Sequence, residues 1–350
     1  MSDGTVLSVV VPAHNAERTV GACLDSLQQQ SMPRGAYGII VVDDESTDGT
    51  RDVAELSPDV RVVSQPRAGP AAARNRGAAE ARGEYLVFVD ADCEADHDFL
   101  RAITAPMEAD PDVAGVQGRY RSRQRSVVAR FVQIEIEERY ALMEKRAGID
   151  HIGTYAAAFR RRVFLDHGGF DAIFPEASNE DMEFSYRLVS AGHGLRLARN
   201  AFCYHRHPET LRRYIRAKFR HAYWTAILYG RHRDKILKDS YRPKSLRFQV
   251  LSLVGLPLVA GAAGLLTRSL VATLAVCVAY LGIFLFLPML PLVARALRRD
   301  VGAGLLAPII VGARAAAGAS GLVIGILRTS GLWRSGTAQA KGTRPPQGEP

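Results

Sequence analysis

Cysteine is scarce in this 350-residue sequence. The four cysteines are Cys23, Cys93, Cys203 and Cys277. They form no CxxC pair and follow no regular spacing, which argues against a zinc ribbon or a disulfide framework and is typical of a reducing compartment. The first apolar run, Val6 to Val11, is too short for a signal peptide and no basic segment precedes it. We therefore expect the front half of the chain to stay in the cytoplasm.

Acidic residues are scarce in the second half. Residues 201–350 carry 22 Lys/Arg and 5 Asp/Glu, whereas residues 1–200 carry 23 Lys/Arg and 31 Asp/Glu. An acidic front half is expected where carboxylates hold a divalent cation, and a basic half mixed with apolar runs is expected at an anionic lipid surface. The basic residues flank the apolar segments and do not cluster in a patch on a soluble domain. We therefore expect membrane lipids, and no nucleic acid, as partners.

Two glycine motifs are missing as well. No GxGxxG follows the first predicted strand, which argues against a dinucleotide-dependent dehydrogenase. No Gly-rich phosphate loop with a basic residue lies near the N-terminus, which argues against a nucleotidyltransferase.

Residues 7–117 alternate β-branched runs with helical stretches. The predicted strands cover residues 7–12, 37–42, 60–63, 84–90 and 113–117. The predicted helices cover residues 17–30, 71–81, 98–109 and 127–146, and a second strand-and-helix unit runs to about Leu197. Strands that alternate with helices predict an α/β fold with a mostly parallel sheet and flanking helices.

The chain changes character from His205 onward. We expect a catalytic domain over residues 1–204 and a basic amphipathic interfacial segment over 205–246. A membrane region is expected over 247–328, with apolar stretches at 250–266, 270–293 and 301–327. The basic tail, 329–350, is expected to be disordered.

The number of membrane helices is left at two or three. Pro308 and Arg314 lie inside the third apolar stretch, and placing a charge in lipid costs free energy. The sequence therefore does not decide whether this stretch crosses the membrane. By the positive-inside rule, Arg295, Arg298 and Arg299 lie on the cytoplasmic side.

Three polar loops follow predicted strands. They are Pro12 to Asn15, Asp43 to Thr50 and Asp90 to Asp92. Ligands of open parallel sheets bind beyond the carboxyl ends of the strands, so these loops predict one binding edge. Asp90 and Asp92 offer the hard oxygen ligands that Mg²⁺ or Mn²⁺ requires, and such an ion would neutralise a departing diphosphate. The alternative is that Asp90 caps the next turn.

Three further groups carry polar chemistry. Asp43 and Asp44 can accept a hydrogen bond from a base imide or a ribose hydroxyl, or they can form an Asx-type turn. The segment around Arg74 and Asn75 opens a helix and suits phosphate oxygens, although an Ala-rich packed helix would look the same. Acids crowd the start of the helix at Glu180, where one would serve as a general base or simply cap the helix.

These strings, in this order, resemble the family 2 glycosyltransferases with a GT-A fold. The matching segments are VVVPAHNAERTV, VVDDESTDGT, GPAAARNRGAAEARGEYLVFVDADC, IGTYAAAFRRRVFLDHGGFD and NEDMEFSYRLVSAGH, and they span about residues 6–205. The resemblance implies an inverting, single-displacement transfer of a sugar from a nucleotide-activated donor.

The resemblance also implies roles for single residues. Pro12, Asn15 and Asp44 would line the nucleoside pocket. Asp92 would be the direct metal ligand and Asp90 would lie near the ribose, while Asp181 would be the base within its pair with Glu180. Gly153 and Thr154 fall in the acceptor loop. His205 falls where relatives carry a histidine near the diphosphate, sometimes as a metal ligand, and an interfacial imidazole is the alternative.

One departure limits the resemblance. Processive polysaccharide synthases of the family carry QxxRW, whereas this chain has Lys218 to Trp224 in that region, without the glutamine. Arg216 and Arg220 lie four residues apart on one helical face and would steady the diphosphate, or remain solvated or facing lipid.

We therefore expect a glycosyltransferase that acts on a lipid-linked or surface-glycan acceptor at the cytoplasmic face of the inner or plasma membrane. A processive synthase, a nucleotidyltransferase and a catalytically silent membrane scaffold remain as alternatives.

Overall fold

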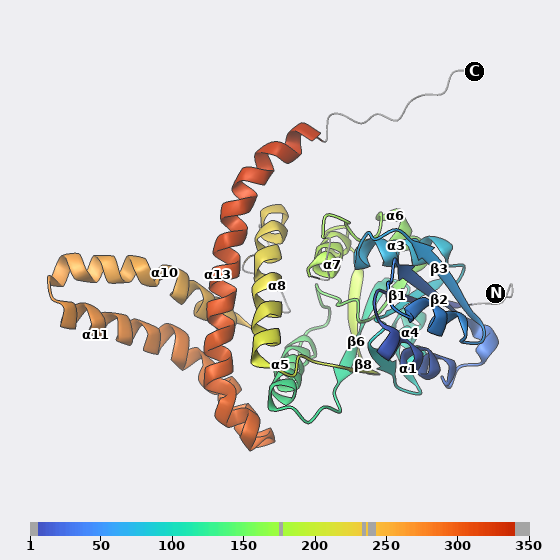
Figure 1. The fold of residues 1–350 in the computed structure, drawn as a ribbon, viewed down its shortest axis with the longest axis horizontal. Coiled ribbons are helices and arrows are strands. Elements are labelled where there is room, and N and C mark those ends of the chain that lie inside the picture. The colour runs from blue at the N-terminus through green and yellow to red at the C-terminus, as the bar shows by residue number, and fades with distance from the viewer. Residues whose placement is uncertain (1–5, 175–177, 233–235, 237–242, 340–350) are drawn as a thin grey trace. The chain divides into compact units, whose positions relative to one another are not determined.

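The computed structural model describes residues 6–174, 178–232, 236 and 243–339 and divides into two compact units. The first unit comprises Met1–Leu211, Leu237–Lys244 and Pro291–Ala307. The second comprises Arg212–Ile236, Ser245–Leu290 and Pro308–Pro350. The sheet, drawn as arrows in Figure 1, lies in the first unit, and most residues of the apolar helices lie in the second. The domain limits expected from the sequence stay a prediction.

An eight-stranded mixed sheet forms the centre of the first unit. Its strands are β1 (Leu7–Ala13), β2 (Tyr37–Asp44), β3 (Val60–Gln65), β4 (Tyr85–Val89), β5 (Cys93–Ala95), β6 (Val113–Arg121), β7 (Ala156–Arg160) and β8 (Gly194–His205), in the spatial order β3-β2-β1-β4-β7-β6-β8-β5. Neighbours from β3 to β4 are parallel, as are β6 and β8. Strand β7 is antiparallel to β4 and β6, and β5 is antiparallel to β8. The five predicted strands and the mostly parallel sheet are confirmed.

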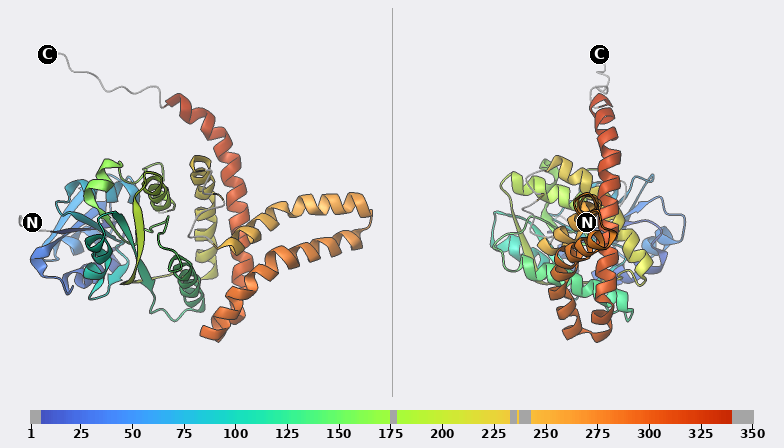
Figure 2. Two further views of the ribbon diagram at one scale, coloured as in Figure 1. Left: turned by 180° about the vertical axis from the view of Figure 1, so that it is seen from behind. Right: turned by 90° about the vertical axis from the view of Figure 1, so that its left-hand side faces the viewer.

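Helices cover the sheet, as Figures 1 and 2 show. They are α1 (Glu17–Gln28), α2 (Thr50–Glu55), α3 (Pro70–Glu80), α4 (Phe99–Ala109), α5 (Val127–Met143), α6 (Arg161–Asp166) and α7 (Glu180–Ser190), with a short 3-10 turn η1 (Arg34–Ala36). The four predicted helices are confirmed as α1, α3, α4 and α5. Helix α3 lies directly on β1, since a Cβ at Gly77 would come within 2.2 Å of Val10 Cγ1.

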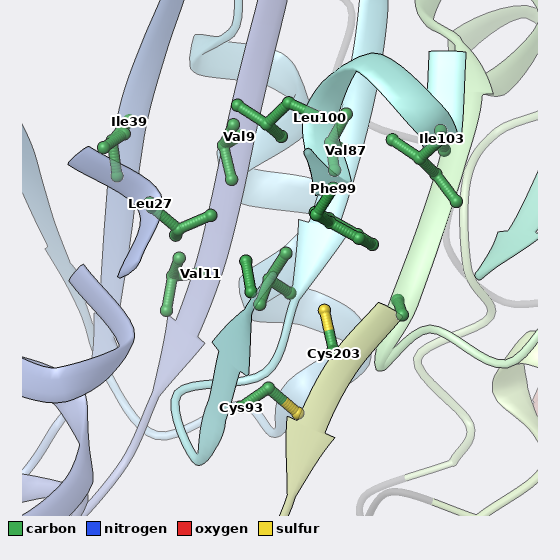
Figure 3. Packing of buried hydrophobic residues seen from close by; sticks show 14 of the residues in the cluster. Val9, Val11, Leu27, Ile39, Val87, Cys93, Phe99, Leu100, Ile103 and Cys203 are labelled. Atoms are coloured by element: carbon green, nitrogen blue, oxygen red, sulfur yellow. The ribbon is translucent and has the colours of Figure 1, made fainter. Parts of the chain in front are cut away.

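Alternate residues of β1 pack into two separate cores. Val9 and Val11 of β1 belong to a buried cluster with α1 and α4, part of which Figure 3 shows. Val10 belongs to a second cluster with α3, α6 and α7. This follows from the twofold side-chain period of a strand that is covered on both faces. Each large apolar side chain that is buried contributes about 1.5–3 kcal/mol, so both cores hold the site's scaffold rigid.

Helix α12 (Leu290–Arg299) is tied to α5 within the first unit. Arg295 pairs with Glu138 at 3.3 Å, and Arg299 pairs with Glu137. Just beyond α12, Asp300 pairs with Arg130 of α5 at 3.1 Å. Exposed pairs of this kind are individually weak, but three in a row fix which face of α12 meets α5.

The second unit is helical. Its elements are α8 (Leu211–Arg231), α10 (Lys244–Thr267), α11 (Leu270–Leu281), the π-turn η2 (Gly282–Phe286), the 3-10 turn η3 (Leu287–Met289) and most of α13 (Val301–Gln339). Among the described residues, the segments Lys244–Thr267, Leu270–Arg299 and Val301–Arg328 are long and apolar enough to cross a membrane. They contain the three predicted apolar stretches, so C-terminal apolar helices are confirmed and membrane association is indicated.

Helix α13 meets two other helices of its unit. A Cβ at Gly321 would come within 2.4 Å of the Phe219 carbonyl oxygen, and one at Gly325 within 2.5 Å of the Tyr223 carbonyl oxygen, so these glycines let α8 and α13 pack backbone against backbone. The buried Arg314 donates a 2.8 Å hydrogen bond to Gln249 Oε1 of α10.

The disorder expected for the C-terminal tail, 329–350, stays a prediction. Helix α13 continues through residue 339, and residues 340–350 lie outside the described part of the chain. Proline, which would end a helix, first occurs in this tail at Pro345, so nothing earlier forces the helix to stop.

Candidate active site

The carboxyl ends of β1, β2 and β4 meet at one edge of the sheet, because these strands are parallel neighbours. Hydrogen bonds join the loops that follow β1 and β2. Asn15 accepts from the backbone N–H of Thr47 at 2.9 Å through Oδ1, and its own N–H donates to Ser46 Oγ at 3.0 Å. Asn15 is exposed with φ of 51°, a conformation that asparagine tolerates well, and Pro12 is partly buried in β1. Two of the predicted polar loops therefore form one surface.

Asp43 and Asp48 organise the loop after β2. Asp43 Oδ1 accepts from the Ser46 N–H at 3.3 Å, which is the local turn that the sequence left open as an alternative. Asp48 accepts from the N–H of Thr50 at 3.1 Å and from that of Glu17 at 3.3 Å, so one carboxylate serves the starts of both α2 and α1.

Asp44 anchors the chain that follows β3. The carboxylate is 2% exposed and accepts four hydrogen bonds. The donors are Gln65 Nε2 at 2.7 Å, Arg67 Nη1 at 2.7 Å, Ala68 N at 2.8 Å and Gly69 N at 2.9 Å. Burial raises the pKa of Asp44, but these donors outweigh it and hold the pKa below the usual value. Its expected role in nucleoside binding stays a prediction, and the structure adds a structural role.

Arg74 joins carboxylates from two distant motifs. Its Nη2 lies 2.7 Å from Asp90 Oδ1 and its Nη1 lies 2.9 Å from Glu180 Oε1, while the arginine is only 2% exposed. Burial lowers the pKa of Arg74, but the two carboxylates more than offset this and raise the pKa above its usual value. Its guanidinium thus holds acids in place inside the protein, and its expected contact with phosphate stays a prediction.

Asp181 lies beside this buried network. Its Oδ1 accepts from the N–H of Met182 at 2.7 Å and its Oδ2 from the N–H of Thr154 at 3.4 Å, so the predicted acceptor loop and the predicted base are in contact. Burial, followed by the negative charge of Glu180, raises the pKa of Asp181 to about 8. A partly buried carboxyl with a pKa near neutrality is suited to proton transfer.

Asp92 is paired with His205 by the register of two short strands. Strand β5 runs antiparallel to β8, which places Cys93 opposite His205. As a result, His205 Nε2 lies 3.5 Å from Asp92 Oδ2. Burial raises the pKa of Asp92, but the hydrogen bond and charge of His205 outweigh it and lower the pKa.

This donor set fits a divalent cation that takes only part of its ligands from the protein. A carboxylate oxygen and an imidazole nitrogen are both ligands for Mn²⁺, and Mg²⁺ commonly keeps water and substrate phosphate oxygens as its remaining ligands. Within the described part of the chain, no three His, Cys, Asp or Glu side chains form a group that could enclose a metal. Asp90, the third predicted ligand, accepts from Arg74. The metal assignment stays a prediction.

Two other predicted groups have different surroundings. Asn75 donates to the Phe170 carbonyl oxygen at 2.7 Å and accepts from the Phe170 N–H at 2.9 Å, so its amide fastens the loop after α6. Arg216 and Arg220 are exposed on α8, in the second unit, and their contact with a diphosphate stays a prediction.

An aromatic and imidazole cluster that was not predicted from the sequence lies beside Asp92. The Tyr120 ring stacks on His205 and on Tyr155, with centroids 4.3 Å and 3.6 Å apart. His207 Nδ1 lies 3.0 Å from His205 Nδ1. The spacing of two histidines separated by one residue was the signal that could have found His207, because such residues share one side of an extended chain.

The fold and this acidic edge define the GT-A class of α/β proteins. The mannosyltransferase PcManGT from Pyrobaculum calidifontis, solved in complex with GDP-Man and Mn²⁺, has the same fold, with a TM-score of 0.54 and 22% identity over 96% of this chain and 80% of that chain.

Sequence comparisons agree. Residues 8–168 match the model of Glycosyl transferase family 2. The succinoglycan biosynthesis protein ExoA of Rhizobium meliloti is 29% identical over 267 residues, 73% of this chain and 76% of the relative. The poly(ribitol-phosphate) beta-glucosyltransferase of Bacillus spizizenii is 41% identical over 92 residues, 25% of this chain and 14% of the relative. For three curated relatives the matched segment spans only 14%, 34% and 48% of their length. Residues 8–168 are therefore assigned to glycosyl transferase family 2.

Proposed function

We propose that this protein is a metal-dependent, inverting glycosyltransferase. It moves a sugar from a nucleotide-diphosphate donor to a lipid-linked or surface-glycan acceptor at the cytoplasmic face of a membrane. The observation that carries the proposal is the buried contact of Arg74 with both Asp90 and Glu180. It supports a single reaction centre because it brings the end of β4 and the start of α7 to one place.

The donor nucleotide is assigned to the edge formed by the loops after β1, β2 and β4. Pro12, Asn15 and Asp43 lie on this edge, and Asp90 is held there by Arg74. Asp44 already accepts four hydrogen bonds, so it binds a nucleotide base only when one of these donors is replaced by a donor of the base. Arg67 is the donor best able to move, because its side chain is 45% exposed.

The residues around Asp181 are assigned to the acceptor. Asp181 takes the proton of an acceptor hydroxyl as the acceptor oxygen bonds to the anomeric carbon and the bond from that carbon to the diphosphate breaks. Attack from the face opposite the diphosphate inverts the anomeric centre. The Thr154 N–H holds the carboxylate toward the acceptor loop. An acceptor that is already anionic, such as a polyprenyl phosphate, needs no base.

Asp92 and His205 would hold the divalent cation. When bound, Mg²⁺ or Mn²⁺ supplies positive charge that stabilises the departing nucleoside diphosphate. The complex of PcManGT with GDP-Man and Mn²⁺ supports this assignment by analogy of fold. The neighbouring Arg74, which is buried, holds Asp90 in position.

The membrane assignment follows from the apolar helices. Segments Lys244–Thr267 and Leu270–Arg299 are each long enough to cross a bilayer, and a pair of crossings returns the chain to its starting side. Arg295 and Arg299, at the end of the second segment, pair with Glu138 and Glu137 of the catalytic unit. This supports a catalytic unit on the arginine-rich, cytoplasmic side.

A donor screen tests the function. Purified protein in detergent is supplied with UDP-, GDP- and TDP-sugars, Mn²⁺ or Mg²⁺ and a lipid extract, and release of nucleoside diphosphate is measured. We expect release with one donor class that requires both acceptor and metal and that is lost in Asp181→Asn when the acceptor is a hydroxyl. Absence of release with every donor, from folded protein, would refute the proposal.

A further inference from the structure

A line of hydrogen-bonding side chains runs from α5 to the loop after β4. His207 Nε2 lies 2.9 Å from Gln133 Oε1, and His207 Nδ1 lies 3.0 Å from His205 Nδ1. At the far end, His205 Nε2 faces Asp92 Oδ2 at 3.5 Å. None of the roles assigned above uses Gln133 or His207.

The amide of Gln133 sets the direction of this line. Its Nε2 donates to the Tyr120 carbonyl oxygen and to Glu137 Oε1, each at 3.0 Å. Both partners are acceptors, so the amide nitrogen must point at them and the amide oxygen must point at His207. Arg299 pairs with the same Glu137, which fixes that acceptor in turn.

The orientation of the Gln133 amide determines which ring nitrogens of His207 and His205 carry hydrogen. Gln133 Oε1 has no hydrogen to give, so His207 Nε2 carries one and donates it. In a neutral His207 ring Nδ1 is then an acceptor, and the hydrogen between the two rings belongs to His205 Nδ1. In a neutral His205 ring this leaves a lone pair on Nε2, directed at the carboxylate of Asp92, whereas a protonated ring carries a second hydrogen on Nε2 and donates it to Asp92.

The surroundings keep both rings in this geometry. The His205 ring stacks on Tyr120 at 4.3 Å with an interplanar angle of 18°. His207 is 3% exposed, and its backbone N–H donates to Gln124 Oε1 at 2.6 Å. A lone pair and a carboxylate 3.5 Å apart repel each other unless a positive charge lies between them, either a proton on Nε2 or a metal ion bound by both groups.

We propose that Gln133 and His207 are positioning residues that hold His205 as its Nδ1–H tautomer. In this tautomer Nε2 of His205 and the carboxylate of Asp92 receive one divalent cation together. The inference rests on the proposed metal-dependent function and adds the residues that prepare its metal ligand. Outer partners of metal-binding histidines fix the tautomer and ring orientation, and their loss typically lowers metal affinity about 10–100-fold.

The test measures metal binding directly. The full-length protein in detergent is titrated with Mn²⁺ in the presence of UDP or of GDP, and free Mn²⁺ is followed by electron paramagnetic resonance. Pulsed measurements on the bound ion report ¹⁴N coupling from a coordinated imidazole. We expect this coupling in the unaltered protein and its loss in His205→Ala.

The positioning variants separate the hydrogen-bond line from packing alone. Gln133→Leu and His207→Phe are expected to weaken Mn²⁺ binding about 10–100-fold and to reduce the ¹⁴N coupling. His207→Asn is expected to retain both, because its amide oxygen can accept from His205 Nδ1–H. His193→Phe, a histidine in contact with His167, is the control and should change neither. Thermal unfolding of each variant confirms that it is folded.

Each outcome decides between the two proposals. Unchanged Mn²⁺ affinity and ¹⁴N coupling in folded Gln133→Leu or His207→Phe overturn the positioning role. Unchanged binding in His205→Ala, with weakened binding in Asp92→Asn, overturns the inference and leaves the proposed function standing. Unchanged binding in both His205→Ala and Asp92→Asn overturns the metal-dependent function itself. Should His207→Phe unfold, Gln133→Leu tests the same hydrogen bond from its other end.

Discussion

Arg74 and Glu180 lie 106 residues apart in the chain, yet their side chains meet at 2.9 Å in the protein interior. Glu180 is 1% exposed and Arg74 is 2% exposed, so neither charge is solvated by bulk water. A buried ion pair is costly to break because the remaining partner is left as an uncompensated charge. This pair fixes the start of α7, and with it Asp181, relative to the end of β4.

Replacing Arg74 should therefore destabilise the catalytic unit. Arg74→Met leaves the buried Glu180 without its cation, and we expect a loss of about 3–5 kcal/mol in the free energy of unfolding. Chemical denaturation monitored by fluorescence measures it. Arg76→Met is the matched control, because Arg76 is exposed and pairs with Glu80 on the same helix, and it should change stability by less than about 0.5 kcal/mol. Equal losses in the two variants would contradict the role of the buried pair.

The rate of transfer to a hydroxyl acceptor should rise with pH. Asp181 accepts a proton only when ionised, and its pKa is raised to about 8, so activity should be low at pH 6 and approach a plateau above pH 9. Asp181→Asn should lower kcat by about 10²–10⁴-fold and remove this pH limb. Initial rates between pH 6 and 10 measure both effects. Asp166→Asn, an exposed acid of the same unit, should keep the profile, and a flat profile in the unaltered protein would rule out Asp181 as the base.

Removing the metal should stop turnover. We expect EDTA to abolish nucleoside diphosphate release and added Mn²⁺ or Mg²⁺ to restore it. Asp92→Asn should lower kcat/KM by at least about 100-fold, because a preorganised charge near the leaving group is lost. Glu94→Gln is the matched control, since Glu94 lies two positions away and pairs with Arg123. Near-normal turnover by Asp92→Asn would remove Asp92 from the metal site.

The contact between α8 and α13 can be tested with two glycines of one helix. A Cβ at Gly321 would meet the Phe219 carbonyl oxygen at 2.4 Å, whereas one at Gly312 would meet no described atom within 4 Å. Gly321→Ala should therefore cost about 1–3 kcal/mol through overpacking. Gly312→Ala should be neutral or stabilise by up to about 1 kcal/mol through helix propensity. Thermal unfolding in detergent compares them, and an equal response of the two variants would contradict the close packing.

The local sequence pattern was sufficient to predict the sheet and the acidic residues at its edge. Val9, Val10 and Val11 alternate between two cores, and that period of two is a property of neighbouring residues. The order of strands was harder, because β7 runs antiparallel between β4 and β6 through pairings that join distant parts of the chain. Pairings of this kind produce no periodic pattern within a single segment of the sequence.

The amino-acid sequence by itself determined which side chains stand at the ends of the strands, among them Asp44, Asp90 and Asp92. Only the tertiary structure decided what each one touches. The carboxylate of Asp44 accepts hydrogen bonds from donors within residues 65–69. Asn75 forms a hydrogen bond with Phe170, which lies 95 residues further along the chain. His207 meets Gln133 across 74 residues. The reason is physical: propensity and periodicity act between near neighbours, whereas the hydrogen bonds and charges that set a side chain's chemistry depend on groups brought close by folding.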